Sequence, residues 1–231
     1  MQLGIRLHDI KKAPLEERLA IAKEQGFLCG HLALSKVIKE YPVDDGALTP
    51  GYAMYLKKIF AKNDLDIAVL GCYLNLANPD EGQLAKITHR YLAHIRFASL
   101  LGVGVVGTET GAVNEAYKFE EKNHSDEALD IFIQNVKPVI SYAEKMGVIF
   151  AIEPVWKHIV CNPKRGWITQ SYHLRIGKIH PGRNHLILTD QRLFKFFQPS
   201  NGSKCLFFDL GSLLRGLLGR RCLHPGIGGF I

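Results

Sequence analysis

Five short apolar runs alternate with longer amphipathic segments over the first two thirds of the chain, and this alternation most constrains its fold. Continuous apolar runs of this length are typical of strands buried on both faces, whereas the segments between them repeat apolar residues at helical spacing. Parallel strands joined by right-handed helical crossovers produce this order, in either a doubly wound sheet or a (β/α)8 barrel. The expected strands are 3–7, 27–34, 66–73, 103–107 and 148–152.

Residues at the helix ends support the same alternation. Pro14 suits a first helical turn, and Gly26 suits the end of the same helix. Ser125 suits a helix N-cap, and Asp126 and Glu127 follow it, where their charges complement the positive end of the helix dipole. The expected helices therefore lie within 14–26, 52–61, 84–102 and 125–147.

Polar residues at the carboxyl ends of all five expected strands favour the barrel. A Gly-x-Gly-x-x-Gly turn after the first strand would favour a nucleotide-binding sheet, and the sequence has none. In a parallel barrel the carboxyl ends of the strands meet at one mouth, where active sites are built. The alternative, a loop residue that merely faces water, explains one such position more easily than all five. The strand ends carry His8 and Asp9, then His31 with Ser35 and Lys36, then Tyr73 and Asn75, then Glu109, and finally Glu153.

The composition changes after Glu153. Beyond this residue the chain contains no Glu, Ala or Met, and no Val after Val160. Residues 1–153 carry 17 Lys and Arg against 20 Asp and Glu, whereas residues 154–231 carry 12 against 2, so the net charge of +7 comes from the tail. From about Gly166 the amphipathic periodicity also disappears. We therefore expect the N-terminal part of a TIM-type (β/α)8 barrel, incomplete at about five βα units, over 1–165, and an atypical basic tail over 166–231.

Two interpretations of this tail stay open. Its basic residues, with Phe194, Phe196 and Phe197 as stacking groups, would suit an arm that binds nucleic acid. A reading-frame shift near Arg165, which replaced the second half of a barrel with sequence never selected to fold, better explains the joint loss of Ala, Val and Glu. On the second interpretation the tail is poorly ordered, and the partial barrel leaves its strand edges exposed.

Cysteine spacing and hydropathy exclude several protein classes. The five cysteines lie 17 or more residues apart, so the chain has no Cys-x-x-Cys metal or redox pair, and scattered thiols are typical of cytosolic proteins. The first residues are too polar for a signal peptide, and no apolar run approaches the roughly 20 residues that a membrane helix needs. We expect a cytoplasmic protein without a membrane segment.

Five segments, taken in order, resemble the xylose-isomerase-like TIM barrels, in particular the sugar phosphate isomerases and epimerases. The resemblance covers residues 1 to about 165. It implies a metal-dependent enzyme that moves a proton on a sugar or sugar phosphate through an enediolate intermediate. The segments are LGIRLHD at 3–9, GHLALSK at 30–36, LGCYLNL at 70–76, GTETG at 107–111 and AIEPVWKH at 151–158.

The resemblance implies a metal site centred on Glu153. This residue would bind a divalent ion, Mn²⁺ or Mg²⁺, and also act as the base that moves the proton. The family pattern calls for a later Asp, a His and a second catalytic Glu, but no Glu follows Glu153. Asp190 is the candidate for the later metal ligand. Asp209 looks more like the family's strand-ending Asp, although it comes late in the sequence.

The remaining roles that the resemblance implies concern the substrate. Trp156 would pack on the apolar face of a sugar, and His158 would form a hydrogen bond to it. The other residues of the mouth would bind sugar hydroxyls: His8, His31, Asn75 and Glu109.

Three functions remain open at this point. The first is the sugar isomerase or epimerase, and the second is an inactive, truncated remnant of one, because the second catalytic Glu is missing. The third is an abasic-site endonuclease of the same superfamily, which would need several His ligands and a basic DNA-binding face; the net negative charge of residues 1–153 counts against it. The identity of the sugar, its phosphorylation and any homo-oligomer also stay open.

Overall fold

Five parallel strands form the centre of the computed structural model, which describes residues 2–166, 168–169, 186–188, 195–197 and 205–208. They are neighbours in sequence order, and each adjacent pair is parallel. The prediction of a TIM-type arrangement with about five βα units is confirmed, with strand bounds within two residues of those expected. The strands are β1 (Gln2–Arg6), β2 (Cys29–Leu32), β3 (Asp66–Gly71), β4 (Val105–Thr108) and β5 (Ile149–Ile152).

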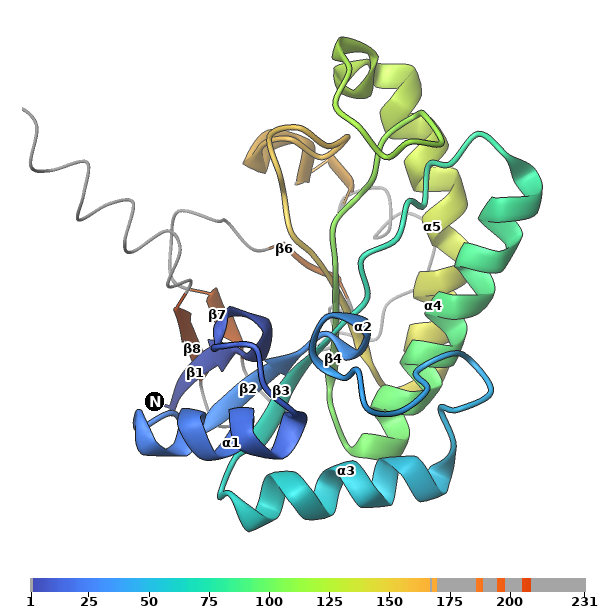
Figure 1. Cartoon of the computed structure of the whole chain (residues 1–231). Coiled ribbons are helices and arrows are strands. Elements are labelled where there is room, and N and C mark those ends of the chain that lie inside the picture. The colour runs from blue at the N-terminus through green and yellow to red at the C-terminus, as the bar shows by residue number, and fades with distance from the viewer. Residues whose placement is uncertain (1, 167, 170–185, 189–194, 198–204, 209–231) are drawn as a thin grey trace, which may run out of the picture.

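Four long helices cover one side of this sheet, and Figure 1 shows α4 and α5 packed side by side. Side chains such as Ile5, Leu70 and Phe150 project from the strands toward these helices and are completely buried in the main hydrophobic core. No helix in the described part of the chain is long and apolar enough to cross a membrane. The helices are α1 (Leu15–Glu24), α3 (Pro50–Lys62), α4 (Glu81–Leu101) and α5 (Asp126–Met146).

The predicted N-cap at Ser125 is confirmed. Its hydroxyl oxygen accepts a hydrogen bond of 3.1 Å from the backbone N–H of Ala128 in the first turn of α5. Gly102 and Gly147 end α4 and α5 in the left-handed conformation, which glycine adopts without a steric penalty. Three short elements were not predicted because so few residues carry no periodicity: α2 (Leu34–Val37) and the 3₁₀ turns η1 (Leu7–Asp9) and η2 (Glu121–His124).

Three further strands come from the tail, where the periodicity of apolar residues predicted none. They are β6 (Leu186–Leu188), β7 (Lys195–Phe197) and β8 (Cys205–Phe208). β6 pairs in parallel with β5, and β8 pairs in parallel with β1, so the prediction that these two edges are exposed is wrong. Backbone hydrogen bonds to a sheet edge require only an extended segment and no side-chain periodicity, which explains why the pattern missed them.

The order of the eight strands departs from a closed parallel barrel. β7 runs antiparallel to β8, and among the described residues no pairing joins β6 to β7. Asp190, Phe194 and Asp209 lie outside the described residues. The five consecutive units from β1 to β5 are therefore the part of the fold that positions a site.

His94 on α4 predicts a loss of stability in mild acid. Its ring is buried, and Nδ1 donates to the carbonyl oxygen of Arg90 at 3.0 Å. Burial, and next the charge of Arg90, lower the pKa of His94 to about 4. An unfolded histidine has a pKa of about 6.5, so the unfolded chain binds the proton more tightly, and the native state should lose up to about 3 kcal/mol as the pH falls from about 6.5 to about 4.

Urea unfolding at pH 7 and pH 4.5 measures this loss. His94→Gln retains a side-chain N–H donor but does not titrate, so the variant should lose less stability than the wild type over the same interval. Equal losses in the two proteins would show that protonation of His94 does not destabilise the fold.

Candidate functional site

The inner face of the sheet gathers polar side chains at its carboxyl end. Alternate residues of a strand face opposite sides. Val105 and Ala151 pack together in a small apolar cluster on the inner face of the sheet. Glu109 lies four residues after Val105, and Glu153 lies two residues after Ala151, so the alternation of the strands directs both glutamates to this face. The backbone N–H of Glu153 donates to the carbonyl oxygen of Thr108 at 2.8 Å, which continues the ladder beyond the end of β5.

Glu109 and Glu153 occupy matching positions on neighbouring strands. The register pairs Thr108 of β4 with Ile152 of β5, so the next residues, the two glutamates, also lie side by side. Neighbouring strands are separated by about 4.8 Å, so the backbones of Glu109 and Glu153 lie close together at the carboxyl end of the sheet. Both residues are half-buried. Paired carboxylates in such a place can accept protons from a substrate or bind its hydroxyl groups.

His31 and Tyr73 form a hydrogen-bonded pair on the neighbouring strands. His31 Nε2 lies 2.8 Å from the Tyr73 hydroxyl, and the ring of His8 stands edge-on to that of His31, with centroids 5.5 Å apart. Burial raises the pKa of Tyr73 well above its usual value, and the negative charges of Glu153 and Glu109 raise it further. Tyr73 therefore keeps its proton and remains a hydrogen-bond donor close to both carboxylates. The ammonium of Lys36 lies 4.3 Å from the centroid of the Tyr73 ring.

Gly71 leaves the space that the His31–Tyr73 pair fills. A Cβ atom at this position would overlap His31 Nε2 and lie 2.8 Å from Tyr73 Cε2. We expect Gly71→Ala to displace one of the two rings and to destabilise the chain by roughly 1–3 kcal/mol, as overpacking does in other cores. Gly107→Ala is the matched control, because its Cβ would meet only a methyl group of Val69, at 3.0 Å.

Thermal unfolding of the two glycine variants tests this expectation. Gly71→Ala should melt well below Gly107→Ala. Equal melting temperatures would mean that the His31–Tyr73 pair tolerates displacement without cost.

His158 lies close to Glu109. Its Nδ1 is 3.6 Å from Glu109 Oε2, and its ring stacks on Tyr117 with centroids 5.2 Å apart. Burial, and then the charge of Lys157, lower the pKa of His158 to about 4, although Glu153 opposes the shift. His158 is therefore neutral near pH 7, and it meets Glu109 as an uncharged ring.

Asn75 connects the loops that follow β3 and β4. Its Oδ1 accepts hydrogen bonds from the backbone N–H groups of Ala77 at 3.1 Å and Ala112 at 3.0 Å, and its Nδ2 donates to the carbonyl oxygen of Asn114 at 2.9 Å. The side chain is only 5% exposed. Asn75 thus stabilises the loops at the carboxyl end of the sheet. These bonds engage both polar atoms of the side chain, Oδ1 and Nδ2, which we expected to bind sugar hydroxyls.

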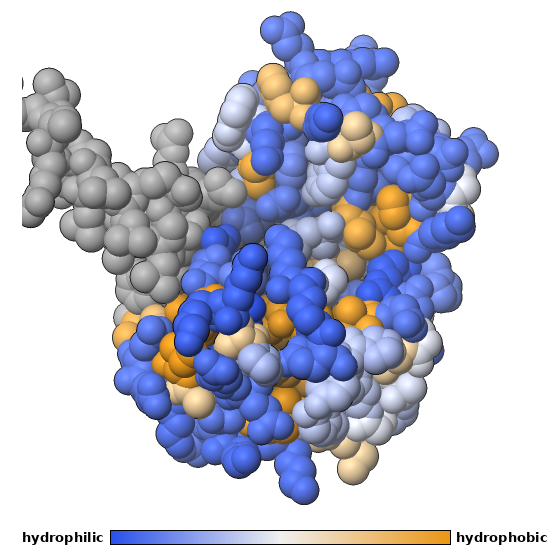
Figure 2. Space-filling view, in the orientation of Figure 1, coloured by the Kyte–Doolittle hydropathy of each residue, from blue (hydrophilic) through white to orange (hydrophobic). Residues whose placement is uncertain are grey.

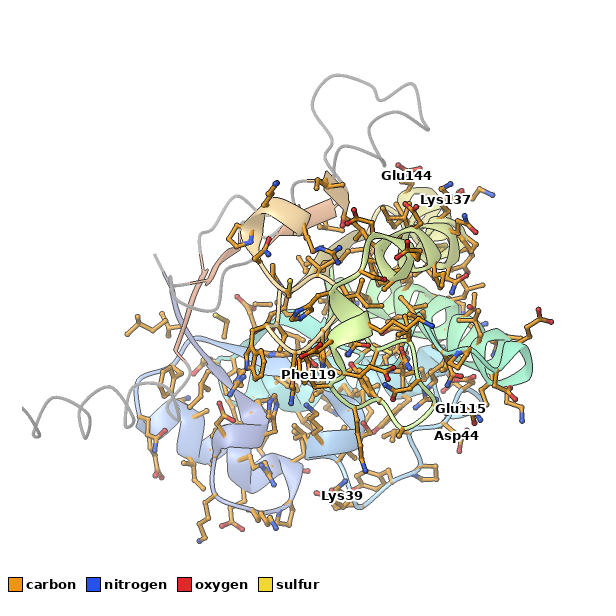
Figure 3. All side chains as sticks on the ribbon, turned by 90° about the horizontal axis from the view of Figure 1, so that it is seen from above. Lys39, Asp44, Glu115, Phe119, Lys137 and Glu144 are labelled. Carbon is orange, nitrogen blue, oxygen red and sulfur yellow. The ribbon has the colours of Figure 1, made fainter. Side chains whose placement is uncertain are left out.

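Trp156 and Phe119 form an aromatic rim beside the mouth. They are 65% and 43% exposed, and their ring centroids lie 5.0 Å apart. His124 fixes this rim, because its Nε2 donates to the carbonyl oxygen of Trp156 at 2.6 Å. Figure 3 places Phe119 toward the middle of the molecule, whereas Glu115 on the same loop lies near its outer edge. The face drawn in Figure 2 is hollowed near its centre and rimmed by hydrophilic residues.

The structure brings most of the predicted residues to one end of the sheet. Tyr73 bonds to His31 and lies close enough to Glu109 and Glu153 for their charges to raise its pKa. His8 packs against His31, His158 lies near Glu109, and Trp156 lies on the aromatic rim. Asp190 lies outside the described residues. Sequence reasoning did not select Tyr117 and Phe119, because both lie in an irregular loop where no periodicity marks the direction of a side chain.

The described residues do not complete a divalent metal site. In the part of the chain that the structure describes, no three His, Cys, Asp or Glu side chains gather closely enough to hold an ion. Glu153 supplies a carboxylate of the kind that Mn²⁺ or Mg²⁺ prefers, but at least two further protein ligands would be needed to complete a metal site of three side chains.

Comparison with known proteins gives a family match. A family model described as xylose isomerase-like TIM barrel matches residues 19–168. No curated protein matches the sequence.

Solved structures with the same fold include a sugar epimerase and an epimerase-like protein. D-psicose 3-epimerase from Clostridium cellulolyticum H10, solved with D-tagatose, has a TM-score of 0.61 and 15% identity over 82% of this chain and 63% of its own. A D-tagatose 3-epimerase-like protein has a TM-score of 0.57 and 20% identity over 82% of this chain and 64% of its own. The IOLI protein, solved with a zinc atom, has a TM-score of 0.58 and 19% identity over 74% and 58%. The chain thus spans less than two thirds of each.

Proposed function

The chain belongs to the xylose isomerase-like TIM barrels, and from this premise we propose that it is a sugar isomerase or epimerase that moves a proton at a carbon beside a carbonyl group. The observation that carries the proposal is the convergence of Glu109, Glu153 and the His31–Tyr73 pair at the carboxyl end of consecutive parallel strands. In a TIM-type fold this end of the sheet is where active sites are built.

Glu153 is the proposed base. Its carboxylate takes the proton from the carbon next to the carbonyl group, and the electron pair of the broken C–H bond forms a carbon–carbon double bond while negative charge moves to the carbonyl oxygen. In an isomerase, Glu153 returns the proton to the former carbonyl carbon while the proton of the adjacent hydroxyl group passes to the former carbonyl oxygen; in an epimerase, a proton returns to the original carbon from the opposite face. Tyr73, which keeps its proton, supplies a hydrogen-bond donor near this charge.

The other residues of the mouth bind and orient the substrate in this proposal. Trp156 and Phe119 present exposed aromatic surface that suits the apolar face of a sugar. His8 and His31 stand beside the carboxylates, where their ring nitrogens suit sugar hydroxyls. Lys36 adds a positive charge beside Tyr73, so both a sugar and a sugar phosphate remain proposed substrates.

The proposed cofactor is a divalent ion, Mn²⁺ or Mg²⁺, which would polarise the carbonyl and hydroxyl oxygens when bound. Glu153 and Asp190 are the proposed ligands. The described residues do not complete such a site, so the proton transfer above is derived from the side chains alone. We also propose a cytoplasmic location and no nucleic-acid partner, since residues 1–153 carry a net negative charge.

Conversion of ketoses tests the proposed function. The 231-residue chain is incubated with D-fructose or D-tagatose, once with added Mn²⁺ and once with EDTA, and the sugars are separated by chromatography. A new sugar that forms with Mn²⁺ and does not form with EDTA would support both the activity and the metal. No new sugar in either buffer would contradict the proposed activity.

A second candidate is an inactive remnant of such an enzyme. One observation favours it: no Glu follows Glu153 in the 231 residues, so the second catalytic Glu that the family pattern calls for is missing from them. Binding of a ketose without conversion, seen by ligand-observed NMR, would support this candidate over the enzyme.

A further inference from the structure

A cavity on the helical side of the molecule lies apart from the strand ends that carry the proposed active site. The loop before α3, the middle of α4 and the last turns of α5 enclose it, and its volume is about 420 Å³. Sites for small molecules have volumes of about 300–1,000 Å³. Figure 3 places Asp44, the neighbour of one lining residue, at the outer edge of the molecule. The lining includes Asp45, His89, Leu92, Ala93, Arg96 and Tyr142.

Asp45 contributes a negative charge that the protein itself compensates. Its Oδ1 accepts a hydrogen bond from Arg90 Nη1 at 2.5 Å, and its Oδ2 lies 2.9 Å from His89 Nδ1. Burial alone would raise the pKa of Asp45, but the hydrogen bonds from Arg90 and His89 lower it, so the side chain stays ionised. An ionised carboxylate can only accept, so His89 donates through Nδ1, and its other ring nitrogen can serve a ligand.

The loop that carries Asp45 is held in place by the protein alone. Arg90 also donates to the carbonyl oxygen of Val43. Asp44 Oδ1 accepts hydrogen bonds from the backbone N–H groups of Gly46 at 3.0 Å and Ala47 at 3.1 Å. These bonds fold the loop on itself and tie it to α4. The cavity is therefore preformed, which lowers the entropic cost of binding a ligand.

Arg96 contributes a positive charge to the same cavity. It is exposed and lies on α4, seven residues after His89 and so about two helical turns away. In the described part of the chain, the carboxylate of the cavity pairs with Arg90 and His89, and none forms an ion pair with Arg96. A guanidinium presents its N–H donors in a planar fork that matches a carboxylate. The charge of the cavity thus suits an anion.

The remaining lining residues are largely apolar. Leu92 and Ala93 come from α4, and Tyr142 comes from α5. Ala93 belongs to the main hydrophobic core, and the half-buried ring of Tyr142 packs against that core, so both positions are fixed. A flat apolar group that covers these side chains would remove apolar surface from water, which favours binding.

We propose that this cavity binds a small organic anion with a carboxylate on a flat apolar body. The carboxylate pairs with Arg96, and the apolar body covers Leu92, Ala93 and Tyr142. An inorganic anion would leave the apolar lining in water, and a neutral molecule would leave Arg96 without a counter-charge. The proposal is independent of the proposed sugar activity, and its test measures binding alone.

A ligand-observed NMR titration of the 231-residue chain tests this site. The probe is 2-naphthoate, and 2-naphthamide is its uncharged analogue of nearly the same shape. We expect 2-naphthoate to bind with a dissociation constant of about 1 mM or below, the affinity usual for a ligand of this size. The amide should bind at least about threefold more weakly, and this difference should shrink in about 0.5 M salt, because salt screens an exposed ion pair.

Variants of Arg96 locate the bound probe. Arg96→Gln should weaken binding of 2-naphthoate about three- to tenfold and leave binding of 2-naphthamide unchanged, which also shows that the cavity is intact. Arg96→Lys keeps the charge without the planar fork, so its affinity should lie between those of the wild type and Arg96→Gln. Lys58→Gln is the matched control, because it removes one positive charge from an exposed position of α3 outside the lining. It should bind both probes as the wild type does.

Several outcomes would overturn the proposal. Absence of binding at about 10 mM 2-naphthoate would remove the site. Equal affinities for the acid and the amide would remove the role of the charge, and unchanged binding by Arg96→Gln would place the probe elsewhere on the molecule. If sedimentation shows a dimer that Arg96→Gln dissociates, and 2-naphthoate does not bind, the cavity belongs to an interface with a second copy of the chain.

Discussion

Glu153→Gln should lower the rate of ketose conversion by about 10²- to 10⁴-fold, the range for loss of a general base. The amide has nearly the same shape as the carboxylate, but it cannot accept a proton from carbon at neutral pH. Glu153 follows β5 and its backbone N–H bonds to Thr108, so the replacement leaves the sheet pairing in place. The measurement is the initial rate of product formation at saturating sugar.

Glu144→Gln is the control for this change. Glu144 is an exposed residue of α5, and Figure 3 places it on the outer side of the molecule. The control variant should keep the wild-type rate. A Glu153→Gln rate close to that of Glu144→Gln would contradict the role of Glu153 as the base.

Gly111→Ala should destabilise the fold by roughly 3–5 kcal/mol, the largest stability effect that we expect of a single methyl group. Gly111 has a φ of +92°, a conformation that is strained for alanine. The added Cβ would also overlap Asn75 Oδ1 and lie 3.2 Å from Asn75 Cα. Asn75 would have to move, and the backbone N–H groups of Ala77 and Ala112 would lose their acceptor.

The variant Gly26→Ala separates the free-energy cost of the strained backbone from the cost of displacing Asn75. Gly26 has a similar φ of +81°, but nothing lies within 4 Å of an added Cβ. This variant should lose only the backbone contribution of about 1–2 kcal/mol. Chemical unfolding of both variants gives the comparison, and equal losses would show that the Asn75 hydrogen bonds contribute little.

The arrangement of the first five strands was predictable because each carries a strong local signal. Continuous apolar runs such as 148–152 and helix ends such as Ser125 and Gly147 identify βα units without knowledge of their packing. Parallel pairing then brings the strand ends together, so Glu109 and Glu153 could be assigned to one mouth from the sequence.

Other features depend on packing that the sequence pattern does not encode. Asn75 was expected at the mouth, but its hydrogen bonds to the loop at Ala112 arise only when the two loops meet. Tyr117 lies in an irregular loop, where its contact with His158 depends on long-range folding. The strands β6, β7 and β8 were missed because pairing to a sheet edge needs no side-chain period.

Deuterium entry into D-fructose, followed by NMR in D₂O containing Mn²⁺, most directly tests whether the ends of β4 and β5 hold a proton-transfer site. We predict that the wild-type chain introduces deuterium at the carbon next to the carbonyl group and that Glu153→Gln does not. Equal rates of deuterium entry with the two proteins, or no entry with either, would contradict the assignment of this site.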